Sequence, residues 1–175
     1  TYRFHLLLLA LWLFHSAHSL AIIQRSQGVP SQDGVDTYML SREFHQSMEV
    51  SGTRHKLKAV AKTYLHAEEE NPPLMGLLGG VALSLWGDSP WSVALVNLLF
   101  LLLLLGSTYT LTRHLATDQE GLAALAALVA SFMPQVVGLS RSPQPHLAVA
   151  AWTLASLSLL LATRSFRSRR SSVLF

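Results

Sequence analysis

The 175-residue sequence contains no cysteine and few charged residues. The missing cysteine excludes disulfides and thiolate metal ligands. Only 13% of the residues are charged while 50% are hydrophobic, whereas a soluble domain carries about 25% charge. The run 97–106 has almost none of the polar residues that a water-facing helix needs. These deficits argue against a soluble bundle and predict an integral membrane protein.

Acidic residues are also scarce, and seven of the ten lie in the segment 24–71, between apolar stretches. Because charge is costly in hydrocarbon, this segment is predicted to be a loop at one membrane face, where any chemistry should also lie. The net charge of +3 and the pI near 9.6 do not come from a continuous basic face. Nucleic acid is therefore not an expected partner.

The apolar segments predict helices. The segment 4–23 is long enough to span as a retained first helix, and it also reads as a signal peptide with a candidate cleavage site at Ser16–Ser19; either exports the following loop. The segment 72–86 is short and rich in glycine, which predicts a buried or half-inserted helix. Residues 91–111, 121–139 and 146–163 read as full membrane helices.

The predicted fold class is therefore all-α: a polytopic helical membrane protein with about four transmembrane helices, a short buried or half-inserted helix, and an extracytoplasmic loop with amphipathic interfacial helices. The predicted units are a first transmembrane helix or signal peptide (1–23), the loop (24–71), the transmembrane helical region (72–163), and a basic cytoplasmic tail or the start of the next loop (164–175).

Two helices are expected inside the loop. Apolar residues at helical spacing from Leu57 to Leu65, with lysines on other faces, predict a helix in the headgroup plane. A weaker stripe of Leu40, Phe44 and Met48 predicts a second helix with Asp36 as its N-cap.

Basic residues orient the chain only weakly, since their count is nearly equal on the two sides. We give more weight to the cluster that directly follows an apolar segment, because the charge rule acts near helix ends; it comprises Arg164, Arg167, Arg169 and Arg170. The loop 24–71 is then extracytoplasmic. The expected location is the bacterial inner membrane or the plasma membrane, or the endoplasmic reticulum membrane in a eukaryote.

Four motifs occur in an order that points to a known family. They are DGVDTYMLSREF at 33–44, ENPPLMGLL at 70–78, LWGDSPWSVALVNLLFLLLLLGSTYTLTRHL at 85–115 and GLAALAALVASFMPQVVGLSR at 121–141. Each is weak alone. In this order the chain from residue 33 to 163 resembles the polytopic transferases that use polyprenyl-phosphate sugars: glycosyltransferase family 39, the protein mannosyltransferases, and the related aminoarabinose transferases of lipid A.

The resemblance places Asp33 on the family's catalytic aspartate, with Gly34 where a second acid is usual and His146 where many relatives carry an aspartate. A carboxylate at the membrane face suits such chemistry, because the acceptor must lose a proton as it attacks an oxocarbenium-like centre. Other readings remain open, because Asp33-Gly34 also fits an ordinary turn.

The candidate substrate-binding residues are Glu70, Asn71, Arg42 and Arg141. Basic side chains suit the leaving phosphate. Glu70 also fits a solvated charge run, and Arg141 also fits an interfacial arginine that reaches to headgroups.

No metal or cofactor is predicted, because the eight histidines form no tight ligand pattern. The expected partners are membrane lipid, a polyprenyl-phosphate sugar donor, an acceptor protein or glycolipid, and the remaining helices of a longer chain.

The sequence thus predicts the N-terminal portion of a membrane glycosyltransferase, inactive in isolation, with Asp33 as general base. The alternative is a non-catalytic small helical membrane subunit that binds lipid or a partner complex.

Overall fold

The computed structural model describes residues 2–25, 32–50, 52–67, 73–116 and 119–163, and every regular element in these ranges is a helix. In chain order they are α1 (Tyr2–Arg25), α2 (Gln32–Glu49), α3 (Thr53–His66), α4 (Pro73–Trp86), α5 (Pro90–Ala94), α6 (Val96–Leu115), α7 (Glu120–Phe132), α8 (Pro134–Leu139) and α9 (His146–Ala162). The predicted all-α fold is confirmed.

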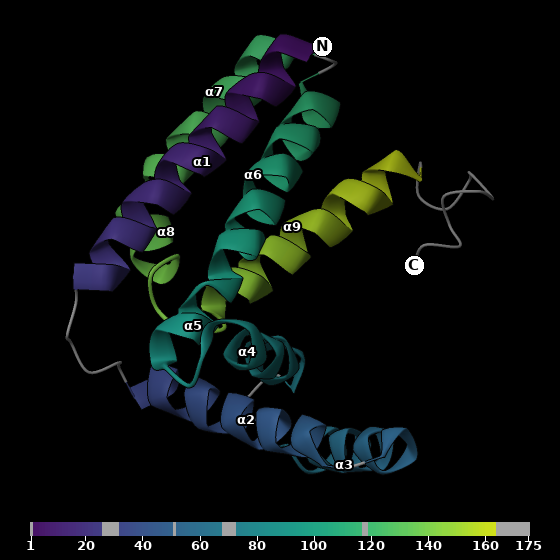
Figure 1. Ribbon diagram of the computed structural model, residues 1–175. Helices are drawn as coiled ribbons and strands as arrows, with labels where there is room; N and C mark the ends of the chain where they lie inside the picture. The colour runs from purple at the N-terminus through teal and green to yellow at the C-terminus, as the bar shows by residue number, and fades with distance from the viewer. Residues whose placement is uncertain (1, 26–31, 51, 68–72, 117–118, 164–175) are drawn as a thin grey trace.

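The helices form a bundle with a layer across one end (Figure 1). Helices α1, α6 and α7 run side by side, and α9 packs against α6 while leaning away from α1. Helices α2, α3 and α4 lie across the end where α1 finishes and α6 begins. The layer comes from the acid-rich loop and from the short apolar segment that follows it.

Two helices of the described chain are long and apolar enough to cross a membrane: Arg3–Ile23, with 21 residues, and the continuous stretch Pro90–Leu115, with 26. Helices α4, α7 and α9 are apolar but shorter. The segment 121–139 was expected to form a single helix, and this is wrong. The backbone is extended at Met133 (φ −61°, ψ 127°), because the following Pro134 disfavours helical geometry in the residue before it.

The core lies around α6. Its residues Leu101 and Leu105 are buried and pack with Ala151 of α9. The indole Nε1 of Trp12 donates a hydrogen bond to the Leu98 carbonyl at 2.7 Å, which ties α1 to α6. The segment read as either a first helix or a signal peptide is thus a packed helix of the bundle.

Helix α2 packs on α4 through a glycine face. Gly76, Gly79 and Gly80 are all buried, and a Cβ added to any of them would collide with α2. The α2 residues at this contact are Leu40, Ser41 and Phe44, all buried. Small residues at such spacing allow helix backbones to approach closely.

The 14 residues of α4 span about 21 Å, less than the hydrocarbon thickness of about 30 Å, as predicted for a buried or half-inserted helix.

Gly80→Ala is expected to lower stability, although alanine is the better helix former by about 1 kcal/mol. The added Cβ would lie 3.0 Å from the backbone nitrogen of His45 and 3.0 Å from the Ser41 carbonyl oxygen, and backbone atoms of a packed helix cannot easily move away. Overpacking of this kind costs about 1–3 kcal/mol. The measurement is thermal unfolding of the purified protein in detergent.

The matched control is Gly106→Ala in α6, where an added Cβ meets nothing within 4 Å. This variant should be as stable as the parent or more so. Equal stability of the two variants would show that α2 does not depend on the glycine face.

Candidate active site

The first turn of α2 meets the start of α9 at one end of the bundle. His146 Nε2 lies 3.4 Å from Asp33 Oδ2, although 113 residues separate the two in sequence. Both side chains are more than half exposed, so a substrate hydroxyl can reach the carboxylate. His146 is the first residue of α9, where the positive end of the helix dipole favours a nearby anion. The arrangement is an acid beside an imidazole at an open surface.

Asp33 owes its position to the start of α2, which begins at Gln32. An acid in the first turn is favoured there by the free N–H groups of the helix end. The Thr37 hydroxyl donates to the Asp33 carbonyl at 2.9 Å. The reading of Asp33-Gly34 as an ordinary turn is therefore wrong. The predicted N-cap at Asp36 is also wrong, because Asp36 lies in the second turn with its side chain exposed.

Arg141 lies in the connection between α8 and α9 and reaches α1. Its Nη2 is 2.9 Å from His18 Nδ1, and its Nε is buried without a hydrogen-bond partner in the described part of the chain. The hydroxyls of Ser19 and Ser140, 3.4 Å apart, join the same two segments. Arg141 thus joins the connection between α8 and α9 to α1, and its guanidinium is a group of the kind that binds phosphate.

A single buried amide holds this connection against α6. Asn97 is fully buried, and its Oδ1 has no partner among the described residues. Its Nδ2 donates towards three carbonyls of the connection: Leu139 at 3.2 Å, Ser142, and Gln144 at 2.9 Å. Asn97 therefore positions the backbone that carries Arg141 and leads to His146.

The sequence analysis placed Asn97 in an apolar run and missed this role. The signal was nonetheless present, because a lone amide within a leucine-rich membrane helix needs a partner inside the protein.

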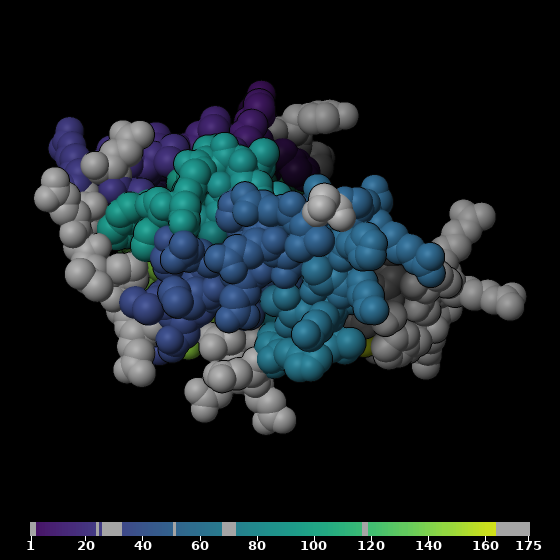
Figure 2. Space-filling model, turned by 60° about the horizontal axis from the view of Figure 1, so that its bottom comes forward, coloured from purple at the N-terminus to yellow at the C-terminus, as the bar shows by residue number. Residues whose placement is uncertain are grey.

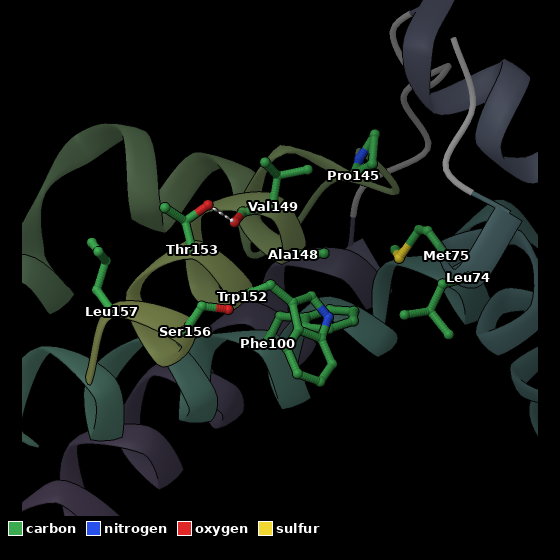
Figure 3. A pocket seen from close by; sticks show the side chains of 10 residues that line it. All are labelled: Leu74, Met75, Phe100, Pro145, Ala148, Val149, Trp152, Thr153, Ser156 and Leu157. Atoms are coloured by element: carbon green, nitrogen blue, oxygen red, sulfur yellow. Dashed lines mark hydrogen bonds between the residues drawn. The ribbon is translucent and has the colours of Figure 1, made fainter. Parts of the chain in front are cut away.

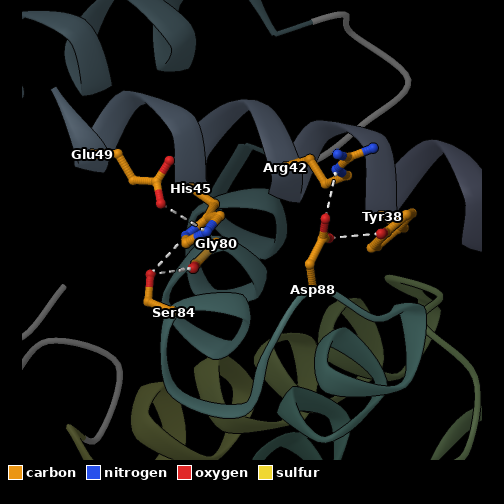
Figure 4. Close-up of polar contacts among 7 residues, drawn as sticks. All are labelled: Tyr38, Arg42, His45, Glu49, Gly80, Ser84 and Asp88. Atoms are coloured by element: carbon orange, nitrogen blue, oxygen red, sulfur yellow. Dashed lines mark hydrogen bonds and ion pairs between the residues drawn. The ribbon is translucent and has the colours of Figure 1, made fainter.

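Arg42 forms part of a polar contact between α2 and the turn after α4 (Figure 4). Its Nε lies 3.3 Å from Asp88 Oδ2, and the Tyr38 hydroxyl donates to Asp88 Oδ1 at 2.7 Å. Burial raises the pKa of the Tyr38 phenol, as do the hydrogen bond and the charge of Asp88, while Arg42 opposes the rise. Tyr38 accordingly remains a hydrogen-bond donor at neutral pH.

Arg42 follows Asp33 by nine residues, which places it about 14 Å along α2 and on the opposite side of the helix. It faces the turn at Asp88 rather than the pair formed by Asp33 and His146. Its role in substrate binding stays a prediction.

A second polar contact joins α2 to α4. His45 Nδ1 is 2.9 Å from Ser84 Oγ, and His45 Nε2 is 3.5 Å from Glu49 Oε1 (Figure 4). The order Ser, His, Glu is that of a hydrolytic triad. However, the Ser84 hydroxyl donates to the Gly80 carbonyl of its own helix at 3.1 Å. We interpret this contact as structural.

An apolar pocket of about 490 Å³ runs along α9 (Figure 3). Its lining is contributed by α9, the start of α4 and one residue of α6: Pro145, Ala148, Val149, Trp152, Thr153, Ser156, Leu157, Leu74, Met75 and Phe100. In Figure 3, Leu157 lies at one end and Met75 and Leu74 lie at the other, with Pro145 above them, and the ring of Trp152 lies by that of Phe100. Because Pro145 directly precedes His146, one end of the pocket adjoins the acid–imidazole pair.

Glu70 and Asn71 lie outside the described residues, so their roles stay predictions. Within the described ranges, no three His, Asp or Glu side chains are grouped so that they could hold a metal ion.

The fold and composition define a helical integral membrane protein. Comparison with protein families gives a match to dolichyl-phosphate-mannose-protein mannosyltransferases over residues 70–174. The chain therefore belongs to this family of membrane glycosyltransferases, as the motifs predicted. Arg141 and His146 lie inside the matched region, and Asp33 and Arg42 lie before it. Comparison with curated proteins and with solved structures gives no match.

Asn97→Leu is expected to loosen the connection between α8 and α9, because it removes the amide donors while keeping a similar volume. Breaking buried hydrogen bonds of this kind costs about 1–3 kcal/mol. The sequence has no cysteine, so a Ser142→Cys substitution supplies a unique thiol. Its rate of alkylation in membranes should rise in the Asn97→Leu background.

Thr110→Val is the control, since the Thr110 hydroxyl of α6 donates to the Gly106 carbonyl of its own helix. Alkylation should be unchanged there. If Ser142→Cys is alkylated at the same rate with and without Asn97→Leu, Asn97 does not hold the connection between α8 and α9.

Proposed function

We propose that this chain activates the acceptor in a membrane glycosyltransferase that moves a sugar from a polyprenyl phosphate to an extracytoplasmic hydroxyl, with Asp33 as general base. The observation that carries the proposal is the Asp33–His146 pair, at the open end of the bundle, in a member of the mannosyltransferase family. A general base must be within reach of the proton that it removes, and this carboxylate is exposed.

In the proposed reaction, Asp33 takes the proton of the acceptor hydroxyl as its oxygen attacks the anomeric carbon of the sugar. The bond between that carbon and the phosphate oxygen breaks, and polyprenyl phosphate leaves with the bonding electrons. Attack on the face opposite the leaving group inverts the anomeric configuration. A phosphate is a good leaving group, so it needs cationic neighbours rather than an acid.

His146 fits a positioning role towards Asp33. When its Nε2 carries a proton, it donates to Asp33 Oδ2 and leaves Oδ1 free for the acceptor. The resemblance led us to expect an aspartate at this position. An imidazole at 3.4 Å instead orients the base, much as the members of a nucleophile–base–acid array orient one another.

Two features of the described chain match the polyprenyl-phosphate sugar donor. The guanidinium of Arg141, whose Nη2 lies beside His18, supplies positive charge for the phosphate, and the apolar pocket along α9 offers a surface for isoprene units. Arg141 precedes His146 in the sequence, and the α9 residues that line the pocket follow it.

We assign substrate contacts to Glu70 and Asn71 as well, since in the sequence they lie within three residues of the start of α4. Arg42 stays a candidate substrate contact, and its ion pair with Asp88 also holds α2 in place.

The alternative, a non-catalytic membrane subunit that binds lipid or a partner complex, has less support. Nothing in such a role requires an exposed carboxylate paired with a histidine from a distant helix.

Asp33→Asn is expected to lower sugar transfer by about 10²–10⁴-fold, because a neutral isostere cannot accept the acceptor's proton. The assay is transfer of radiolabelled sugar from the polyprenyl phosphate in membranes that express the chain in its natural gene context. Asp36→Asn, an exposed acid one turn along the same helix, should retain transfer.

Two results would contradict the proposal: normal transfer by an Asp33→Ala enzyme, or thiol labelling that places position 33 in the cytosol. Loss of transfer with normal insertion would argue against the subunit alternative.

His146→Ala is expected to lower transfer by about 10–100-fold, because the carboxylate loses the group that orients it. In the Asp33→Asn background it should cause little further loss, since residues that act as a unit are not additive. His114→Ala, an exposed histidine at the other end of α6, serves as control. Additive losses would show that His146 acts independently of Asp33.

A further inference from the structure

The contact between Arg141 and His18 fixes the protonation state of the histidine. Arg141 Nη2 lies 2.9 Å from His18 Nδ1, and 123 residues separate the two in sequence. A guanidinium carries N–H donors and no acceptor, so the imidazole nitrogen accepts this hydrogen bond. A nitrogen that accepts carries no proton. His18 is therefore neutral in this contact, with its proton on Nε2.

A neutral partner leaves the charge of Arg141 uncompensated. Arginines that only hold helices together are commonly paired with a carboxylate, as Arg42 is with Asp88. In the described ranges, however, no carboxylate forms an ion pair with Arg141. His18 thus holds the guanidinium without neutralising it. A cation held in this way keeps its charge for an anionic ligand, and a guanidinium matches the geometry of phosphate.

The imidazole that holds Arg141 is itself fixed in place. The ring of His18 stacks on that of Phe14, with centroids 6.2 Å apart and planes 23° apart. Phe14 in turn contacts the ring of Phe132 in α7 at 6.3 Å. Because Asn97 holds the backbone near Arg141, the arginine is positioned at both its main chain and its guanidinium.

The pair formed by His18 and Arg141 is open to a ligand near the candidate active site. His18 is exposed and Arg141 is half-buried, and Arg141 precedes His146 by five residues along the connection that Asn97 holds. Helices α2 and α3 cover the middle of the bundle end, and α1 lies at the edge of the same face (Figure 2). A ligand can therefore reach the pair without displacing the layer.

We infer that His18 is a positioning residue for the donor: as a neutral acceptor it aims the guanidinium of Arg141, which binds the phosphate of the polyprenyl-phosphate sugar. This inference rests on the proposed function for the identity of the donor, and not on Asp33 as the base. Loss of His18 should weaken donor binding without slowing the chemical step, because His18 does not contact the reacting atoms. Since other lipid phosphates and free phosphate share this chemistry, the test separates the three sources.

The first measurement is equilibrium binding of radiolabelled polyprenyl phosphate to the protein expressed in its natural gene context and purified in detergent. His18→Leu should weaken binding about 10-fold, because a hydrogen bond to a charged group no longer orients the guanidinium. His18→Asn should bind like the parent, since the Asn Oδ1 takes the place of Nδ1 as acceptor. His5→Leu, the same substitution at an exposed histidine of α1, should also bind like the parent.

Polyprenol, which lacks the phosphate, is the matched ligand. His18→Leu should bind polyprenol like the parent, because Arg141 has no phosphate to contact. A variant whose fold was merely disturbed would lose both ligands. Unlabelled phosphatidylglycerol and inorganic phosphate, each at the concentration of the labelled ligand, should displace little of it.

The transfer assay separates this inference from the proposed function. His18→Leu should raise the KM for the donor about 10-fold and leave kcat near that of the parent, whereas Asp33→Asn should lower kcat. Normal transfer by Asp33→Asn together with weak donor binding by His18→Leu would overturn the base and keep the role of His18.

Several results would overturn the inference. They are absence of polyprenyl-phosphate binding by the parent, unchanged binding by His18→Leu, equal loss of polyprenol binding, and binding by His18→Asn as weak as that by His18→Leu. Displacement by phosphatidylglycerol as strong as that by unlabelled polyprenyl phosphate would mean that the site accepts any lipid phosphate. Equally strong displacement by inorganic phosphate would mean a site for free phosphate.

Discussion

The architecture depends on close contact between α2 and the glycine face of α4. Side chains at these positions would push the helices apart, because Gly76, Gly79 and Gly80 lie directly against side chains and backbone of α2. Two polar contacts, at Asp88 and at Ser84, bind the same helix pair. These contacts fix α2 over the end of the bundle.

The other half of the candidate site is placed by a separate element. Asn97 binds the backbone between α8 and α9 to α6, and this connection leads directly into His146. Asp33 therefore depends on packing against α4, and His146 depends on a buried amide. Apolar burial is not directional, whereas an amide in a membrane helix can be satisfied only by groups at particular positions. The two requirements meet where α2 passes the start of α9.

The errors of the sequence analysis concern where helices begin and end. Asp36 fits an N-cap by residue type, but α2 begins at Gln32, and Gly34, Thr37 and Ser41 are buried on its packed face. Composition did not show that the late proline divides 121–139 into α7 and α8.

The sequence by itself determined the helical membrane class, the family, the amphipathic loop and the candidate base, because hydropathy, local periodicity and ordered motifs are properties of neighbouring residues. Only the tertiary structure decided that His146 meets Asp33, that Arg141 reaches His18, and that Asn97 anchors their connection. These contacts join residues 42 to 123 positions apart, and such pairings arise from how the helices pack against one another, which no local pattern encodes.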